Sequence, residues 1–232
     1  MKPSSQFAVV AGLCLLGLQS SQAEEYSFQQ GVSGYTGTRD TTIGEDWADE
    51  SYSDYYVFWM DGWMAGAGEE QGLLGFDGIF GADPGQIPYG SPIVSATVSL
   101  YVMNAGSGFT VHRMLIPWEE TVTWNGLNDG VQANGIEAVV EPDFSIGEGT
   151  HAEHIPIGPL DVDVTASLRA WSAGESDYGW AFLPFEGGSD AVAFYSSEAS
   201  SYHPVLTVVI PEPATLFLVA AWAVVPARRR HS

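Results

Sequence analysis

Hydrophobic and polar residues alternate along much of the chain, most clearly from Ile93 to Met103. In this segment every second residue is apolar, namely Val94, Ala96, Val98, Leu100 and Val102. Successive side chains of a strand point to opposite faces, so the pattern predicts a strand with one buried and one solvated face. Residues 104–108 are typical of a turn, and residues 109–113 resume the alternation as a return strand.

Shorter segments of the same kind predict further strands, at 55–59, 73–76, 121–124, 179–183, 191–195 and 205–210. Glycine (27 residues) and proline (13 residues) are frequent, as is typical of sheet proteins with many turns. The fold class we predict is all-β, a single β-sandwich of jelly-roll type. In segment 55–59 we expect Tyr55, Val57 and Trp59 to point inward, with Tyr56 and Phe58 outward.

One short helix is predicted near residues 165–174. Thr165 is suited to cap its N-terminus, and Gly174 lies where a left-handed residue commonly ends a helix. Leu168 and Trp171 share one face of this helix. We expect that face to pack on the sandwich, which makes Trp171 a core residue rather than a ligand platform.

The N-terminal residues 1–23 predict a secretory signal peptide. Lys2 precedes the apolar run 7–18, and Ser21-Gln22-Ala23 is typical of a cleavage site after Ala23. As a helix the run is about 18 Å long, shorter than a hydrocarbon core of about 30 Å, which disfavours an uncleaved anchor. The chain's one cysteine, Cys14, lies here, and Leu13 before it disfavours lipoprotein processing. The mature chain would then have neither disulfides nor thiolate metal sites.

The C-terminal residues 211–232 combine Pro211, Glu212 and Pro213 with an apolar segment at 214–227 and a basic end, Arg228, Arg229 and Arg230. The three arginines are expected to stay on the cytoplasmic side. The apolar segment is about 21 Å long as a helix, and Pro226 weakens its last turn. We therefore expect a transient transmembrane sorting helix that is later cut, with a simple C-terminal anchor as the alternative.

This tail resembles the PEP-CTERM sorting signal of Gram-negative bacteria. The resemblance covers residues 211–232 and includes all three parts in order. It implies that exosortase, a membrane transpeptidase-like enzyme, cuts the chain near Pro211, Glu212 and Pro213. It also implies an inner-membrane intermediate, followed by a place on the cell surface or in the extracellular matrix.

The body of the chain is strongly acidic. Lys and Arg number 7 and Asp and Glu number 29, which gives a net charge of −22. Between residues 24 and 210 the bases are Arg39, Arg113 and Arg169. A nucleic-acid partner and a polybasic membrane patch are excluded because both need a basic face. Hydrophobic residues (45%) and aromatic residues (12%) suffice for a core, and we expect one domain at 38–210 after a linker at 24–37.

Six segments of this domain resemble, in the expected order, the DNRLRE domain, a β-sandwich related to disaggregatase-type and carbohydrate-binding modules. They are residues 73–77, 93–102, 117–125, 163–171, 177–179 and 194–198. Gly75 departs from the family pattern, which often has arginine there. The acidic and aromatic stretch 45–71 is also longer than the usual loop. The resemblance implies a sandwich fold and carbohydrate binding.

Exposed aromatic rings are the candidate glycan contacts, because they stack on sugar faces. Trp47, Trp63 and Trp118 are the candidates, and Trp124 is expected in the core with Val122. A candidate Ca²⁺ site is formed by Asp40, Glu45, Asp46, Asp49, Glu50 and Asp54. The simpler interpretation of these acids is a solvated loop. Asp161 and Asp163 are expected on the solvent face of a short strand.

Enzymatic chemistry has weak support in the sequence. Glu119 and Glu120 are adjacent, so they are expected in an exposed turn rather than as a facing acid/base pair. His151 and His154 have a helical metal spacing, but the flanking Gly149 and Pro156 disfavour a helix and a zinc site.

We therefore expect an exported, non-enzymatic surface or matrix protein that binds extracellular polysaccharide. The alternatives are a structural or adhesive protein stabilised by Ca²⁺ and, with less support, a polysaccharide lyase or hydrolase.

Overall fold

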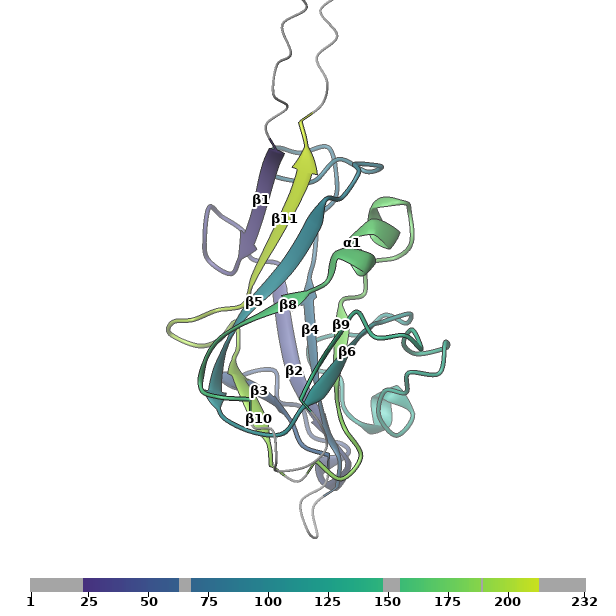
Figure 1. Cartoon of the computed structure of the whole chain (residues 1–232). Coiled ribbons are helices and arrows are strands. Elements are labelled where there is room, and N and C mark those ends of the chain that lie inside the picture. The colour runs from purple at the N-terminus through teal and green to yellow at the C-terminus, as the bar shows by residue number, and fades with distance from the viewer. Residues whose placement is uncertain (1–22, 63–67, 148–154, 189, 213–232) are drawn as a thin grey trace, which may run out of the picture.

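The computed structural model describes residues 23–62, 68–147, 155–188 and 190–212, which form two antiparallel sheets packed face to face (Figure 1). This confirms the predicted all-β sandwich with one short helix; the jelly-roll topology stays a prediction. Helix α1 is Thr165–Ser172, and two short 3₁₀ turns are η1 (Glu45–Trp47) and η2 (Asn125–Leu127). The predicted signal peptide and the transmembrane segment 214–227 lie outside the described residues, apart from Ala23. In the described part of the chain no helix has the length and apolarity to cross a membrane.

The first sheet has six strands in the order β1-β11-β5-β10-β3, with β8 also paired to β5. Their bounds are β1 Ala23–Gln29, β3 Val57–Met60, β5 Ser95–Asn104, β8 Gly158–Asp163, β10 Val192–Tyr195 and β11 Val205–Pro211. Strands β10 and β11 pair with successive parts of β5, and residues 196–204 loop out between them. Asp161 and Asp163 are exposed on β8, as predicted.

The second sheet has five strands in the order β2-β4-β9-β6-β7. Their bounds are β2 Thr38–Gly44, β4 Glu70–Phe76, β6 Phe109–Arg113, β7 Phe144–Ile146 and β9 Trp180–Pro184. The predicted return strand at 109–113 therefore exists, but it belongs to this sheet and not beside β5. The turn at 104–108 carries the chain from one sheet to the other, which lets the apolar faces of β5 and β6 contribute to one core.

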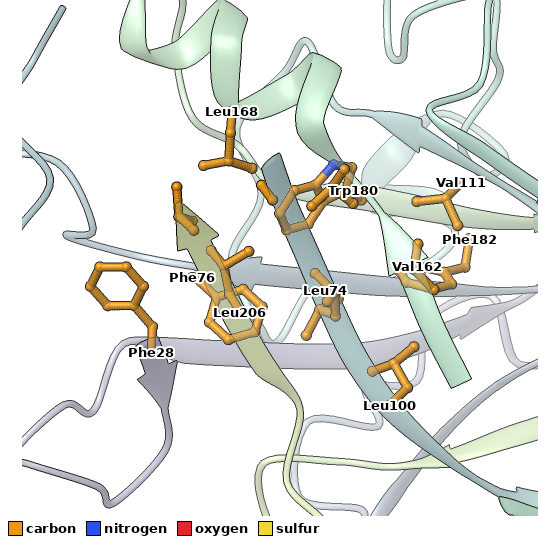
Figure 2. Packing of buried hydrophobic residues seen from close by; sticks show 14 of the residues in the cluster. Phe28, Leu74, Phe76, Leu100, Val111, Val162, Leu168, Trp180, Phe182 and Leu206 are labelled. Atoms are coloured by element: carbon orange, nitrogen blue, oxygen red, sulfur yellow. The ribbon is translucent and has the colours of Figure 1, made fainter. Parts of the chain in front are cut away.

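The main core lies between the two sheets. It is rich in fully buried large side chains, among them Phe58, Leu74, Phe109, Trp180 and Phe194. Leu168 and Trp171 of α1 close one end of this core, as predicted, and Figure 2 shows the Leu168 side chain pointing from the helix toward the other labelled core residues. Burial of apolar area on this scale is the main stabilising contribution to the fold.

A second buried cluster lies on the outer face of the second sheet. The connection between β6 and β7, with η2, folds over Leu73 of β4 and Ala181 of β9 and buries Trp118, Trp124 and Leu127. Trp124 is thus a core residue, as predicted. The expected strand at 121–124 is wrong, because these residues form a turn and the approach to η2.

Two other expectations are corrected near the ends of elements. Residues 24–37, expected as a linker, contain most of β1, which pairs with β11 along its whole length and buries Phe28. Thr165 does not cap α1; its hydroxyl lies beside β5, where it accepts a hydrogen bond from the Ala96 amide (2.9 Å). Gly174 has a φ of +106°, so the expected glycine conformation after the helix is present.

Within β3 the inward and outward faces are the reverse of the prediction, whereas Tyr56, just before the strand, is 56% exposed as predicted. Phe58 and Met60 are buried in the core, whereas Tyr55 is 50% exposed and Trp59 is partly exposed. Both alternating sets in this segment are apolar or aromatic. The period therefore identifies the strand but does not decide which set faces the core.

Candidate functional site

Four aromatic side chains, of which Tyr52 is buried (9% exposed), form one contact cluster where the chain passes from β2 to β3. Trp47 (40% exposed) and Tyr55 (50% exposed) are the outer members, and Trp59 is partly exposed. Tyr52 lies among them, with ring centroids 6.2 Å from Trp47, 5.1 Å from Tyr55 and 5.3 Å from Trp59. These edge-to-face contacts are favourable for aromatic pairs. We call these four residues the aromatic array.

The aromatic array is held in place by hydrogen bonds to both neighbouring strands of the second sheet. The Trp59 amide donates to Oγ1 of Thr42 on β2 (2.8 Å), and the Trp59 indole donates to Oε2 of Glu70 on β4 (2.6 Å). Trp47 ends η1, and the Glu50 amide donates to the Trp47 carbonyl (2.8 Å). A platform fixed in this way loses little conformational entropy when a ligand binds.

Carboxylates surround the aromatic array. Burial raises the pKa of Glu70, although the hydrogen bond from Trp59 opposes the rise. Burial likewise raises the pKa of Glu69, opposed by the hydrogen bond from Gln71. Glu45 lies in η1, directly before Asp46 and Trp47, and accepts the Glu69 amide on Oε2 (3.3 Å). Carboxylate oxygens in such positions accept hydrogen bonds from ligand hydroxyl groups.

Two hollows near η1 share Glu45 and Glu69 in their walls. The larger, about 420 Å³, is also lined by Trp124, Asn125 and Asp129. The smaller, about 360 Å³, is also lined by Gly62, Glu186 and Gly187. Both volumes lie in the usual range of small-molecule sites. None of the described residues that line either hollow is basic.

The three tryptophans predicted as glycan contacts lie in different parts of the chain. Trp47 belongs to the aromatic array, and Trp63 lies outside the described residues. The expected exposure of Trp118 is wrong, because its side chain is 5% exposed in the second cluster. Its indole donates to the Tyr178 carbonyl (2.6 Å), and the Arg39 guanidinium covers its ring at 4.2 Å. The loop that carries Trp118 folds back on the sheet, so the ring packs inward.

The six acids of the candidate Ca²⁺ site are not gathered around one point. Asp40 is 1% exposed, and its Oδ2 accepts the Ser197 amide (2.8 Å), which links β2 to the segment after β10. Burial, followed by the nearby Glu198, raises the pKa of Asp40 well above its usual range. Asp49 accepts a hydrogen bond from the Asn125 side chain (2.8 Å). Glu45, Asp46, Glu50 and Asp54 are exposed. Across residues 23–62, 68–147, 155–188 and 190–212, no group of three or more His, Cys, Asp or Glu is placed to hold a metal ion.

The remaining candidates are placed as follows. Glu119 is exposed, and Glu120 is half-buried with its Oε1 accepting the Asp40 amide (3.1 Å), so the two do not face each other across a cleft. Pro211 and Glu212 are exposed at the end of β11. Pro213, Arg228, Arg229, Arg230, His151 and His154 lie outside the described residues.

Sequence reasoning missed Tyr52, Glu69 and Glu70 as parts of this site. Tyr52 was visible as one of several aromatics, but its position at the centre of the array depends on the path of the loop. Glu69 and Glu70 carried the weak signal of two acids directly before a strand. Comparison with known proteins adds no assignment, because no protein-family model matches the chain and no curated protein matches its sequence.

Proposed function

We propose that the chain is an exported, non-enzymatic surface or matrix protein that binds a neutral extracellular polysaccharide through the aromatic array. The observation that carries this proposal is the fixed, exposed pair Trp47 and Tyr55, braced by Tyr52 and flanked by carboxylates. Aromatic faces stack on the apolar faces of sugar rings, and carboxylates accept the hydrogen bonds of sugar hydroxyls. The array therefore offers both kinds of contact that a polysaccharide needs.

Charge limits which polysaccharide can bind. The net charge is −22, and Arg39, Arg113 and Arg169 are occupied elsewhere in the fold. Arg39 pairs with Asp77, Arg113 pairs with Glu175, and Arg169 donates to the Ile93 carbonyl. An anionic polymer would be repelled within the screening length of about 8–10 Å. The ligand we propose is therefore neutral, or bridged to the protein by Ca²⁺.

Export and sorting by exosortase form the other half of the proposal. The described sandwich begins at Ala23 and its last strand ends at Pro211, and these two residues are cross-strand partners. The predicted cleavage sites thus fall at the outer ends of β1 and β11, away from the core. This supports a route in which the chain passes the inner membrane, is held there briefly by its tail, and is then released to the surface.

The test is a glycan array probed with the purified full chain, with and without a chelator. We expect binding to a neutral polysaccharide, weakened about tenfold by Trp47→Ala or Tyr55→Ala. Tyr89→Ala is the matched control, because Tyr89 is 69% exposed and lies in the connection between β4 and β5, stacked on Phe80. Absence of binding in both conditions would remove the carbohydrate proposal. Glycan binding that is equally strong in Trp47→Ala and Tyr55→Ala would show that the aromatic array is not the binding site.

Two further measurements separate the other functions. A large rise in the melting temperature with Ca²⁺, without any glycan affinity, would favour the Ca²⁺-stabilised structural alternative. A turnover assay on common polysaccharides tests the lyase or hydrolase, and we expect no product.

A further inference from the structure

Strand β1 has an outer edge that no other described strand pairs with, because β1 is the first strand of its sheet. The alternating direction of the backbone hydrogen bonds along β11 and β1 shows which backbone N–H and C=O groups of β1 face that edge. The Val94 amide donates to the Val209 carbonyl, so the backbone groups of Val209 point toward β5. Those of Val208 point the opposite way, to its partner Tyr26 on β1. The backbone N–H and C=O groups of Glu25 and Ser27 therefore point to the open edge.

A hollow of about 940 Å³ runs beside this edge. One wall is made by Glu24, Glu25, Tyr26 and Ser27, and the other by residues 81–86, 88 and 89. Neighbouring side chains of a strand point to opposite faces, so a hollow lined by four consecutive residues also contacts the backbone of β1. We call this hollow the edge groove.

The wall opposite β1 is well fixed. The Gly81 amide donates to the Ile87 carbonyl (3.0 Å), and the Gln86 side chain donates to the Gly78 carbonyl (2.8 Å). The Tyr89 ring is stacked on Phe80, with centroids 5.6 Å apart. Tyr89 is itself 69% exposed, so its other face is available to a ligand. The edge groove is therefore formed before any partner arrives, which lowers the entropic cost of binding.

The side chains of the edge groove specify the charge of its occupant. Glu24, Glu25 and Asp83 contribute carboxylates, Tyr26 and Tyr89 contribute aromatic rings, and none of the described residues that line the groove is basic. Lysine and arginine side chains suit both kinds of wall, through ion pairs and cation–π contacts. A second copy of this chain would bring the same acids edge to edge, and like charges oppose that pairing.

We propose that the edge groove binds an extended basic peptide segment of a partner protein, which adds a strand to β1. Its backbone would pair with the N–H and C=O groups of Glu25 and Ser27, as in other cases of strand addition to a sheet edge. Its lysine or arginine side chains would lie against Glu24, Glu25 and Asp83. This interaction is independent of polysaccharide binding at the aromatic array, which lies near η1 and β3.

The test uses the purified full chain and a synthetic peptide as long as β1, in which lysine and threonine alternate. We expect saturable binding by calorimetry, together with slowed amide hydrogen exchange in residues 23–29 and 81–89. Ser27→Pro removes an edge-facing N–H without removing a bond to β11, and we expect about tenfold weaker binding. Glu25→Lys should weaken binding at least as much, whereas Glu141→Lys, the same charge change at an exposed site, should not.

Two control probes make the result decisive. A peptide of the same sequence with every backbone amide methylated keeps its charge but cannot pair with a strand, so it should not bind. Equal binding of this peptide, or no binding of the unmodified one, would overturn the proposal. An oligosaccharide of glucosamine that gives the same exchange protection would show instead that the edge groove is a sugar site. Glycan binding at the aromatic array should be unchanged in Ser27→Pro, so the two proposals can fail separately.

Discussion

Ala23 and Pro211 lie opposite each other across β1 and β11, at the end of the sandwich where both ends of the described chain emerge (Figure 1). Cleavage after Ala23 shortens β1 by one residue and leaves Phe28 in the core. We therefore predict that mass spectrometry of the exported protein finds Glu24 at the N-terminus and a C-terminus near Pro211–Pro213. Glu212→Ala should leave the tail attached. In the control variant Glu25→Ala, the tail should be removed as in the native chain. Recovery of the intact chain from the cytosol would contradict the proposed route.

Two neighbouring buried tryptophans are predicted to respond differently to the same substitution. Trp171 and Trp180 have ring centroids 4.8 Å apart. The Trp180 indole donates to Asp143 Oδ2 (3.2 Å), whereas the buried Trp171 indole has no acceptor among the described residues. Both lose similar volume on change to phenylalanine. Trp180→Phe should therefore lower the free energy of unfolding by about 1–3 kcal/mol more than Trp171→Phe, as measured in urea. Equal losses would show that the Asp143 contact contributes nothing.

Stability is predicted to fall as the pH rises from about 4 to above 7. Burial raises the pKa of Asp177 to about 7, and it raises the pKa of Asp40 and Asp143 above their usual values. In this window the folded state therefore binds more protons than the unfolded state, and the free energy of unfolding decreases with pH. Urea unfolding at pH 5 and pH 8 should show higher stability at pH 5.

The Asp177→Asn variant isolates one part of that pH dependence. Asparagine keeps an oxygen for the Gly179 amide, which now donates to Asp177 Oδ1 (3.2 Å), but it carries no charge. We expect the variant to lose less stability than the native chain between pH 5 and pH 8. An unchanged slope would mean that Asp177 does not contribute to it.

Gly75 is predicted to be required because of Arg39, its cross-strand partner. A Cβ atom at position 75 would lie 2.9 Å from Nε of Arg39, whose guanidinium also covers the Trp118 ring. Gly75→Arg should therefore destabilise the native chain but be better tolerated together with Arg39→Ala. A double-mutant cycle in urea should give a coupling free energy of about 1–3 kcal/mol. Additive effects would show that the two positions do not share this space.

The sequence predicted the elements whose pattern is set locally. Strand β5 and helix α1 follow directly from their period, because each has apolar residues on one face and polar residues on the other. Trp171 was expected in the core on the same ground. Val94, expected on the buried face of the predicted strand, is instead 52% exposed just before β5. Trp47 was recognised as an exposed aromatic, but its three partners in the array were not, since a period says nothing about contacts within a loop.

By itself, then, the sequence determined the all-β class, the strongly acidic net charge and the position of most strands. Only the tertiary structure decided the rest. Residues 24–37 carry a strand because β11 offers them an edge, and Trp118 is buried because its loop covers the second sheet. The faces of β3 depended on which aromatic set met the opposite sheet. Each of these outcomes is set by contacts between residues far apart in the chain, which local alternation of hydrophobic and polar positions does not encode.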